Sequence, residues 1–317
     1  MIAAPLRIAY LTWMTRLIDQ TTAHARFVAP AHSHPQLWRL LLGIVVIILI
    51  YFGGILGLLG VIWASAGFDV MVMWSARLTA GNTPTAVLLV LATFSGMALG
   101  PMLAAKVLHK RGPGTLFGPW RGVLRGFGLG AGVVGGIIGL SVVLIDPGYV
   151  PVPNVAPSVW LSLLPLALLG LLIQTGAEEV LFRGYLQQQL AARFKSPLIW
   201  AVLPSAIFGM LHFNAAADPS IAWLTVAATG LFGLLAADLT RVTGNIGMAW
   251  GFHFANNTFA LLVMALDGPL SGLALYTTPF TAADTTILLP LIARDMAVTL
   301  ALWTVLRAVL RITYARA

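Results

Sequence analysis

The chain has too few charged residues for a water-soluble protein. Only 9% of its 317 residues are charged, whereas 59% are hydrophobic, and the mean hydropathy is +0.92. These values differ from those of soluble domains, and the apolar runs are too long for a soluble core. In lipid only helices and closed barrels satisfy the backbone, and continuous apolar runs do not fit the alternating pattern of a barrel. The sequence therefore predicts an all-α, polytopic integral membrane protein.

Several other classes are excluded by what is missing. Cysteine is absent, which excludes disulfides and thiolate chemistry. The net charge of +8 does not indicate nucleic-acid binding, because the basic residues are spread over short loops instead of gathering on one face. No signal peptide is recognisable, since Arg7, Arg16 and Asp19 interrupt the first residues. Residues 1–39 are expected to be a cytoplasmic segment, as an amphipathic surface helix over residues 5–26 or a disordered tail, ahead of a membrane domain over residues 40–317.

Eight apolar segments are long enough to cross a bilayer once their ends and tilt are allowed for. If the N-terminus is cytoplasmic, fifteen of the eighteen lysines and arginines fall in loops or span ends on that side. The positive-inside rule therefore predicts that both termini are cytoplasmic. Residues 68–80 are expected to form a short re-entrant or interfacial piece. The spans are expected at residues 40–65, 84–107, 126–146, 158–182, 197–213, 220–240, 245–266 and 286–306.

Glutamate occurs only as Glu178 and Glu179, near the end of the fourth expected span. An ionised carboxylate in hydrocarbon costs several kcal/mol, so an intramembrane acid indicates a functional site. On a helix Glu179 and Arg183 are i,i+4 neighbours in the favourable acid-before-base order. Glu178 is rotated about 100° away from that pair. One acid is therefore expected to be held in an ion pair and the other to be free.

Two of the six histidines fall in apolar spans. His212 ends the stretch that begins at Phe208, and His253 lies four residues before Asn257 on the same helical face. Taken singly, each of these side chains could be a hydrogen-bonded packing residue. Together with Glu178 they place polar groups on three spans that could face a common water-filled cavity. Because Glu178 falls near the inner end of its span and His212 near the outer end of its own, shifted or broken helices are needed to bring them together.

These side chains suit the hydrolysis of an amide by activated water. A buried carboxylate can act as a general base toward water, and a neighbouring imidazole can share the proton. A second imidazole and an Asn amide can donate hydrogen bonds to the developing oxyanion. Glu178, His212 and His253 could instead bind zinc or another divalent metal, although the HExxH pairing is missing and no cofactor is expected. Two hypotheses without catalysis remain open, a membrane binding or immunity protein and an ion-coupled transporter, although no inverted repeat is visible.

A glycine-rich stretch lies in the third expected span. Residues 130–135 match the dinucleotide fingerprint GxGxxG by letter, but that fingerprint needs a preceding strand and a βαβ unit. Small residues at four-residue spacing instead favour a close helix-packing face. This face is expected at Gly128, Gly132 and Gly136 and at Gly135 and Gly139.

Three motifs in order carry a family resemblance over about residues 158–266. Glu178-Glu179-Val180-Leu181-Phe182-Arg183, Phe208 to His212 and His253 to Asn257 resemble the EExxxR, FxxxH and HxxxN motifs of the CPBP family of intramembrane proteases. That family includes the CAAX prenyl endopeptidases and bacterial bacteriocin-processing and immunity-related members. The resemblance implies eight spans, a cavity open toward the cytoplasm, and a membrane-associated peptide or protein substrate in a bacterial inner membrane.

The resemblance also implies a role for each motif residue. Glu178 is expected to activate water with the assistance of His212, while His253 and Asn257 stabilise the oxyanion. Glu179 and Arg183 are expected to hold the helix, and Phe208 supports the site.

Overall fold

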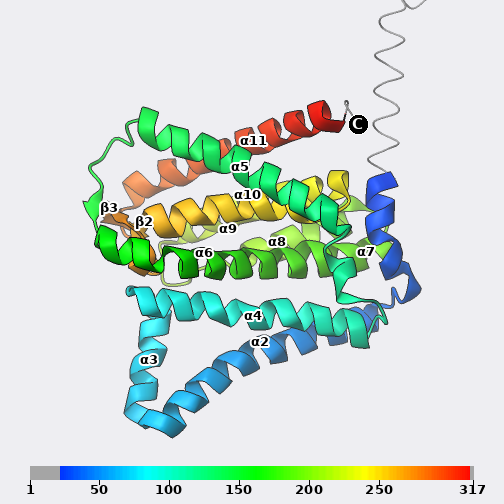
Figure 1. Cartoon of the computed structure of the whole chain (residues 1–317), viewed down its shortest axis with the longest axis horizontal. Coiled ribbons are helices and arrows are strands. Elements are labelled where there is room, and N and C mark those ends of the chain that lie inside the picture. Colours follow the sequence, from blue (N-terminus) through cyan, green and yellow to red (C-terminus); the bar gives the residue numbers. More distant parts are fainter. Residues whose placement is uncertain (1–21, 315–317) are drawn as a thin grey trace, which may run out of the picture.

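The computed structural model describes residues 22–314. It is a bundle of long helices, and the two ends of the described chain lie at the same end of the bundle (Figure 1). Residues 22–28 are helical and lead through the short helix η1 (Ala29–Ser33) into the first long helix. The expected amphipathic helix over residues 5–26 lies mostly outside the described residues.

Within residues 22–314, six helices are long and apolar enough to cross a membrane. An all-α polytopic membrane fold is thus confirmed, but the expected count of eight spans is not. Residues 68–80 form helix α3 (Phe68–Ala80), which joins the first two long helices. The six are α2 (Leu37–Ala66), α4 (Pro84–Val107), α5 (Trp120–Leu144), the continuous helix Pro157–Arg193, α9 (Pro219–Thr243) and α11 (Thr285–Tyr314).

The fifth and seventh expected spans are shorter helices. Residues 197–213 contain the π-helix η4 (Leu198–Val202) and α8 (Leu203–Met210), which together are too short for an ordinary span. Residues 245–266 form α10 (Gly247–Thr258) and the π-helix η5 (Phe259–Val263). The chain then leaves the helix, because residues from Met264 onward adopt extended backbone and pair with another strand.

That pairing belongs to a small sheet that the sequence did not predict. Its strands are β1 (Val152–Pro153), β2 (Met264–Asp267) and β3 (Tyr276–Thr281), in the order β1-β3-β2. Strand β1 is antiparallel to β3, and β2 is parallel to it. The sheet lies at the end of the bundle opposite to the ends of the described chain (Figure 1). Two short helices, η2 (Pro113–Leu116) and η6 (Ser271–Leu273), complete the loops.

The helix that carries the two glutamates continues beyond its expected end at residue 182. Helix α6 (Pro157–Glu179) runs through the π-helix η3 (Val180–Gln187) into α7 (Gln188–Arg193) as one helix of 37 residues. At 1.5 Å per residue, Glu178 lies roughly 20 Å from Arg193 along this helix, and His212 lies roughly 20 Å from the start of η4 at Leu198. Because a short loop joins those two helix ends, the two side chains lie at similar depth. The mismatch inferred from the expected span boundaries therefore disappears.

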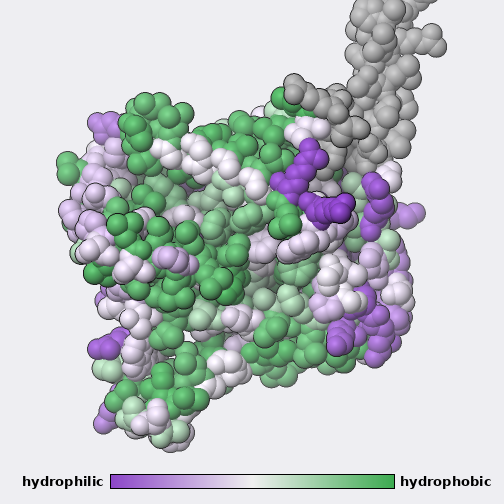
Figure 2. All heavy atoms as spheres, in the orientation of Figure 1, coloured by the Kyte–Doolittle hydropathy of each residue, from purple (hydrophilic) through white to green (hydrophobic). Residues whose placement is uncertain are grey.

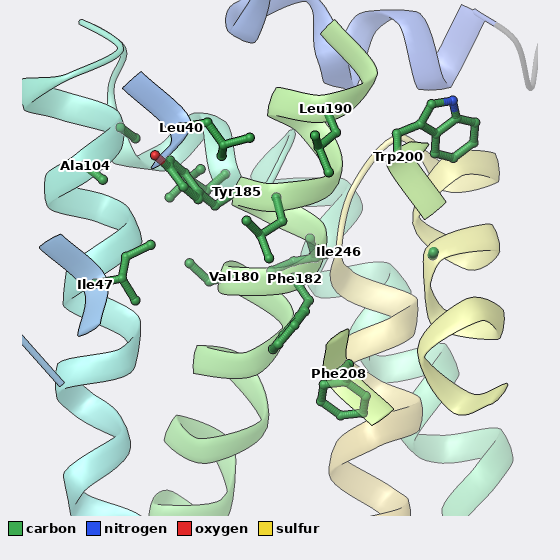
Figure 3. Close-up of a cluster of buried hydrophobic side chains, with 14 of the residues drawn as sticks. Leu40, Ile47, Ala104, Val180, Phe182, Tyr185, Leu190, Trp200, Phe208 and Ile246 are labelled. Carbon is green, nitrogen blue, oxygen red and sulfur yellow. The ribbon is translucent and has the colours of Figure 1, made fainter. Parts of the chain in front are cut away.

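A buried hydrophobic cluster joins this helix to its neighbours (Figure 3). Ile47 of α2 and Ala104 of α4 lie on one side, and Val180 and Tyr185 of η3 lie between them and Phe208 of α8. Burying such side chains removes apolar surface from water or lipid and packs it densely. The cluster therefore fixes the position of η3, which follows the glutamate pair directly.

The close packing face of α5 differs from the one expected. A Cβ atom would meet no other atom within 4 Å at Gly128, Gly132, Gly136 or Gly139. The face that is in contact lies on another side of the helix, where Gly126 and Gly130 touch α10. The predicted spacing was right and the side was wrong, because glycine stripes occur on more than one side of α5 and only the tertiary contact selects one. Gly135 meets only Ala255, at 3.8 Å.

Backbone contact between α5 and α10 is close on both helices. A Cβ at Gly130 would lie 2.6 Å from the carbonyl oxygen of Met248. On α10, Gly247 and Gly251 leave no room for a Cβ against α5, where the carbonyl of Phe127 faces Gly251. Small residues permit this close approach of two membrane helices. Since His253 follows Gly251 by two residues, the contact also sets the position of that imidazole.

The surface matches a membrane protein with one basic end. Figure 2 shows mostly hydrophobic residues along the flanks of the bundle and strongly hydrophilic residues near the end where the described chain begins and ends. Large apolar side chains on α2 are open to the surroundings, with Leu41, Leu49 and Leu56 each more than 60% exposed. Exposed apolar side chains of this kind are favourable in contact with lipid. The first and last described residues thus lie at the same, hydrophilic end of the bundle.

Candidate active site

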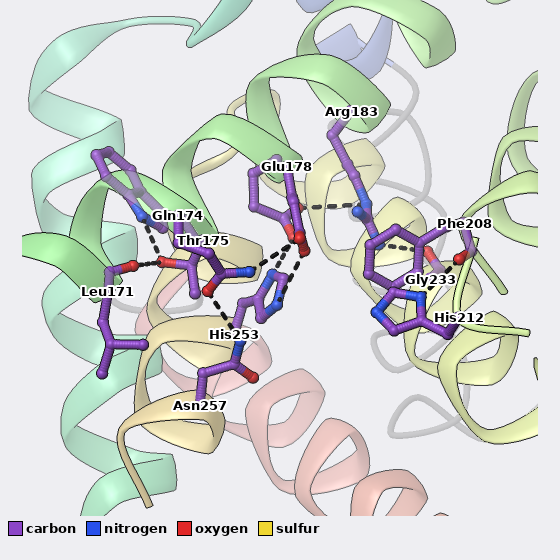
Figure 4. A network of polar contacts seen from close by, with 12 residues as sticks. Leu171, Gln174, Thr175, Glu178, Arg183, Phe208, His212, Gly233, His253 and Asn257 are labelled. Carbon is purple, nitrogen blue, oxygen red and sulfur yellow. Dashed lines mark hydrogen bonds and ion pairs between the residues drawn. The ribbon is translucent and has the colours of Figure 1, made fainter. Parts of the chain in front are cut away.

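The imidazole of His253 contacts both glutamates, and Figure 4 shows it directed toward Glu178. Its Nδ1 is 2.9 Å from Oε1 of Glu179, and its Nε2 is 3.4 Å from Oε2 of Glu178. All three side chains are buried within the helices α6 and α10. A histidine with a carboxylate at each ring nitrogen can hold a proton toward either acid. The structure therefore joins the first and third motifs directly.

Glu179 forms the ion pair that the sequence predicts. Its Oε2 is 3.2 Å from Nε of Arg183, and the two side chains are 0% and 2% exposed. Arg183 also donates from Nη2 to the carbonyl oxygen of Gly233 at 3.1 Å, and its guanidinium lies 5.1 Å from the ring centre of Phe208. A buried charge needs such partners, because isolated charges are costly away from water. Glu179 therefore contacts His253 at Oε1 and Arg183 at Oε2, although the contact at Oε2 is an ion pair and not a hydrogen bond.

Glu178 is less constrained than its neighbour, although it is not wholly free. Its Oε1 accepts a hydrogen bond from Nε2 of Gln174 at 2.9 Å. Its Oε2 has no hydrogen-bond partner among residues 22–314, and the residue is 7% exposed. An ion-pair distance to His253 is the one polar approach to that oxygen in the described chain. One buried carboxylate oxygen thus has unused hydrogen-bonding capacity.

Gln174 links Glu178 to Asn257 and was missed by the sequence analysis. Besides donating to Glu178, it accepts a hydrogen bond at Oε1 from Nδ2 of Asn257 at 3.0 Å. Its position four residues before Glu178, within an apolar run, was the signal that could have found it. Through Gln174, the half-buried amide of Asn257 joins the same polar network.

His212 lies at the edge of this network. It is exposed, and its Nδ1 lies 2.8 Å from the carbonyl oxygen of Phe208, to which it can donate only as the Nδ1–H tautomer. The Phe208 ring connects the two histidines, with its centre 4.9 Å from the ring of His212 and 6.2 Å from that of His253. In the described part of the chain no direct hydrogen bond or ion pair joins His212 to Glu178. The second motif therefore reaches the first through an aromatic ring, and Nε2 of His212 keeps a free lone pair.

The arrangement does not fit a three-ligand metal site. Among the described residues, no three His, Asp or Glu side chains are grouped so that they could hold one ion. Both ring nitrogens of His253 already face carboxylates, and His212 is not grouped with Glu178 and His253. Catalytic zinc sites need three protein ligands around an open position. The conditional metal set of Glu178, His212 and His253 is therefore not assembled.

Each helix that carries a motif also contains a π-helical segment. The segment η3 follows Glu179, η4 precedes Phe208 in the same helix, and η5 follows Asn257. The π-helical segments found in proteins are frequently located at functional sites, where they shift the side chains that follow. No feature of the sequence indicated these three segments.

Helix α10 is fixed to α6 beside the site. Trp250 donates from Nε1 to Oγ1 of Thr175 at 3.2 Å, and its ring packs against Gly176. With the glycine contact to α5, this holds α10 on two sides. Packing between helix backbones, and not flexible loops, therefore positions the side chains that meet at Glu178.

Comparisons with known proteins agree with the motifs. Residues 160–259 match the family model described as type II CAAX prenyl endopeptidase Rce1-like. A relative from Bacillus subtilis (strain 168), the uncharacterized protein YyaK, is 31% identical over 188 residues, which are 55% of this chain and 59% of the relative. The chain thus matches less than two thirds of that relative's length, and no solved structure gives a significant match. Residues 160–259, which contain Glu178, His212 and His253, are thus similar to the Rce1-like family of type II CAAX prenyl endopeptidases.

Proposed function

We propose that this protein is an intramembrane endopeptidase that hydrolyses a peptide bond of a membrane-associated protein or peptide. The observation that carries the proposal is the Oε2 atom of Glu178, which lies inside the helical bundle beside Nε2 of His253 and has no hydrogen-bond partner within residues 22–314. A carboxylate oxygen in that position can accept a proton from water. The match to an endopeptidase family supports a peptide bond as the bond that is hydrolysed.

In the proposed reaction Glu178 takes a proton from water while the water oxygen bonds to the peptide carbonyl carbon. The carbonyl oxygen gains negative charge, and the second N–H of the Asn257 amide can donate a hydrogen bond to it. Glu178 then returns the proton to the nitrogen of the leaving amine as the C–N bond breaks. These steps consume one water molecule, release a carboxylic acid and an amine, and return Glu178 to its starting form without using a cofactor.

The contacts favour His253 as the partner of Glu178. The imidazole faces both carboxylates, with one ring nitrogen directed to each, so it can pass a proton between them. This assigns to His253 the assisting role that the family resemblance gave to His212, and it leaves the exposed His212 to contact the substrate.

The proposed setting is a bacterial inner membrane, with the basic end of the bundle and both termini in the cytoplasm. The excess of basic residues at that end supports this orientation. The bilayer and a membrane-associated substrate are the proposed partners, and nucleic acid is not among them.

The test compares purified wild type, Glu178→Gln and Asp69→Asn on membrane-tethered peptides with and without a C-terminal prenyl group. Asp69 is exposed on α3 away from the network, so its variant controls for a carboxylate-to-amide change. Glu178→Gln should lose at least about a hundredfold in rate, the usual range for a general base. Activity should persist in chelator, since no three-ligand site is assembled. Equal cleavage by wild type and Glu178→Gln would refute the assignment, and peptide binding without cleavage by wild type would favour a binding protein.

A further inference from the structure

A pocket of about 600 Å³ lies at the basic end of the bundle, apart from the candidate active site. It is formed where residues 22–30, the loop around η2, the end of α9 and the last turns of α11 meet. None of the motif residues lines it. Its position at the ends of several spans corresponds to the level of lipid headgroups.

The charge in and around the pocket is strongly positive. Arg26, Arg307 and Arg311 line it, and no acidic residue within residues 22–314 does. Arg26 and Arg311 are exposed and have no ion pair within residues 22–314. Arg307 is held by Asp238 at 3.4 Å, and Asp238 is already shared with Arg241 at 2.9 Å. The pocket therefore has uncompensated cationic donors.

A second, smaller hollow extends this basic region. It measures about 200 Å³ and shares Thr243 and Leu310 with the larger pocket. Arg121 and Arg125, at the start of α5, line it. Five arginines thus surround two adjoining hollows at one end of the bundle.

The lining is also partly apolar. Phe27, Pro30, Val242 and Leu310 contribute to the walls of the larger pocket. Guanidinium groups bind phosphate oxygens through paired N–H donors, and apolar walls suit the glycerol and the first carbons of an acyl chain. A free phosphate would use only the first of these features, whereas a phospholipid uses both. Basic pockets between membrane helices on the cytoplasmic side are a known form of headgroup site.

From these features we propose that the pocket binds the phosphate group of an anionic membrane phospholipid. The inference does not depend on the proposed peptidase activity, because the pocket contains none of the motif residues.

One wall of the pocket contacts the helices that carry the active-site residues. The loop that forms one wall packs with the carbonyl of Leu116 against Gly184 of η3, where a Cβ would not fit. Its Phe117 accepts a hydrogen bond from the backbone N–H of Ile246, just before α10, at 3.1 Å. A bound lipid that orders this wall therefore stabilises the contacts of both glutamate and histidine helices.

The experiment measures lipid binding by full-length protein in neutral detergent. Phosphatidylglycerol or phosphatidylcholine is added, and bound lipid and Tm are followed by native mass spectrometry and thermal unfolding. The variant Arg26→Gln/Arg311→Gln is compared with Arg193→Gln, which removes an exposed charge at the same end but outside both hollows. We expect phosphatidylglycerol to raise Tm, the double variant to bind it at least about tenfold more weakly, and Arg193→Gln to bind as wild type does.

Other results would overturn the proposal. Equal stabilisation of wild type by phosphatidylcholine would remove the role of charge, and this comparison stands even if a variant folds poorly. Equal weakening by Arg193→Gln and the double variant would indicate general surface attraction. Inorganic phosphate or glycerol phosphate that reproduces the full rise in Tm would assign the pocket to a soluble ligand instead of a lipid.

Discussion

The same substitution should destabilise the protein to very different extents at the two adjacent glutamates. Glu179→Gln removes the charge that faces Arg183 at 3.2 Å, while both side chains are almost completely buried. Removing one member of a buried ion pair costs about 3–5 kcal/mol, because the other charge is left without compensation. Glutamine can still accept the hydrogen bond from His253, so we expect about 3 kcal/mol.

Glu178→Gln should have a much smaller effect on stability. Its Oε2 has no hydrogen-bond partner within the described chain, and the amide oxygen of a glutamine can replace Oε1 in accepting from Gln174. We expect a change below about 1 kcal/mol, within the range of a single hydrogen bond. The two variants thus distinguish a residue that stabilises the fold from one whose proposed role is catalytic.

The assay is reversible unfolding in mixed micelles with increasing denaturing detergent, followed by far-UV circular dichroism. A loss of about 3 kcal/mol lowers the folded-to-unfolded ratio by roughly two orders of magnitude, which is easily resolved. Equal destabilisation by the two variants, or a larger loss for Glu178→Gln, would show that the contacts of Glu179 do not distinguish it energetically.

Three further predictions follow from the packing and the polar contacts. Gly251→Leu should separate α10 from α5 and cost at least about 1–3 kcal/mol in the same unfolding assay, whereas Gly132→Leu, which meets open space, should be nearly neutral. Gln174→Ala should lower peptidase activity at least about tenfold by releasing Glu178 and Asn257, with Tm changed by only a few degrees; an unchanged rate would contradict this role. Burial lowers the pKa of His24 to about 4, with the charge of Arg241 as a smaller cause. Neutral His24 therefore favours the packing of residues 22–34 against the bundle above pH 6.5. This packing should weaken as the pH falls from 6.5 toward 4, by at most about 2 kcal/mol at pH 5. Hydrogen exchange of the backbone amides of residues 22–34 measures the strength of this packing, and His24→Gln should abolish its pH dependence.

Local features of the site were predictable because they depend on helical spacing alone. The pairing of Glu179 with Arg183 follows from their i,i+4 positions, and the structure places them 3.2 Å apart. The common face of His253 and Asn257 follows in the same way, since both reach the network around Gln174 and the glutamates. The order of the three motifs sufficed to predict the family that residues 160–259 match.

The span boundaries were less predictable. The apolar run before Glu178 marks hydrocarbon, but the helix continues to Arg193 because buried contacts of η3 replace lipid contacts. The run 245–266 is mostly apolar, yet its last residues form β2, because pairing with β3 satisfies their backbone. Hydropathy reports the environment of a segment and does not report whether it ends in a helix or a strand.

The sequence alone determined that this chain is a membrane protein, which residues form its three motifs, and which acid is paired with arginine. These properties depend on composition and on neighbours within one or two helical turns. The tertiary structure decided that His253 lies against Glu178 while His212 lies behind the ring of Phe208, that Gln174 links Glu178 to Asn257, and that Gly126 and Gly130 form the packing face of α5. Such choices depend on which sides of different helices meet, and that is set by the packing of residues far apart in the chain.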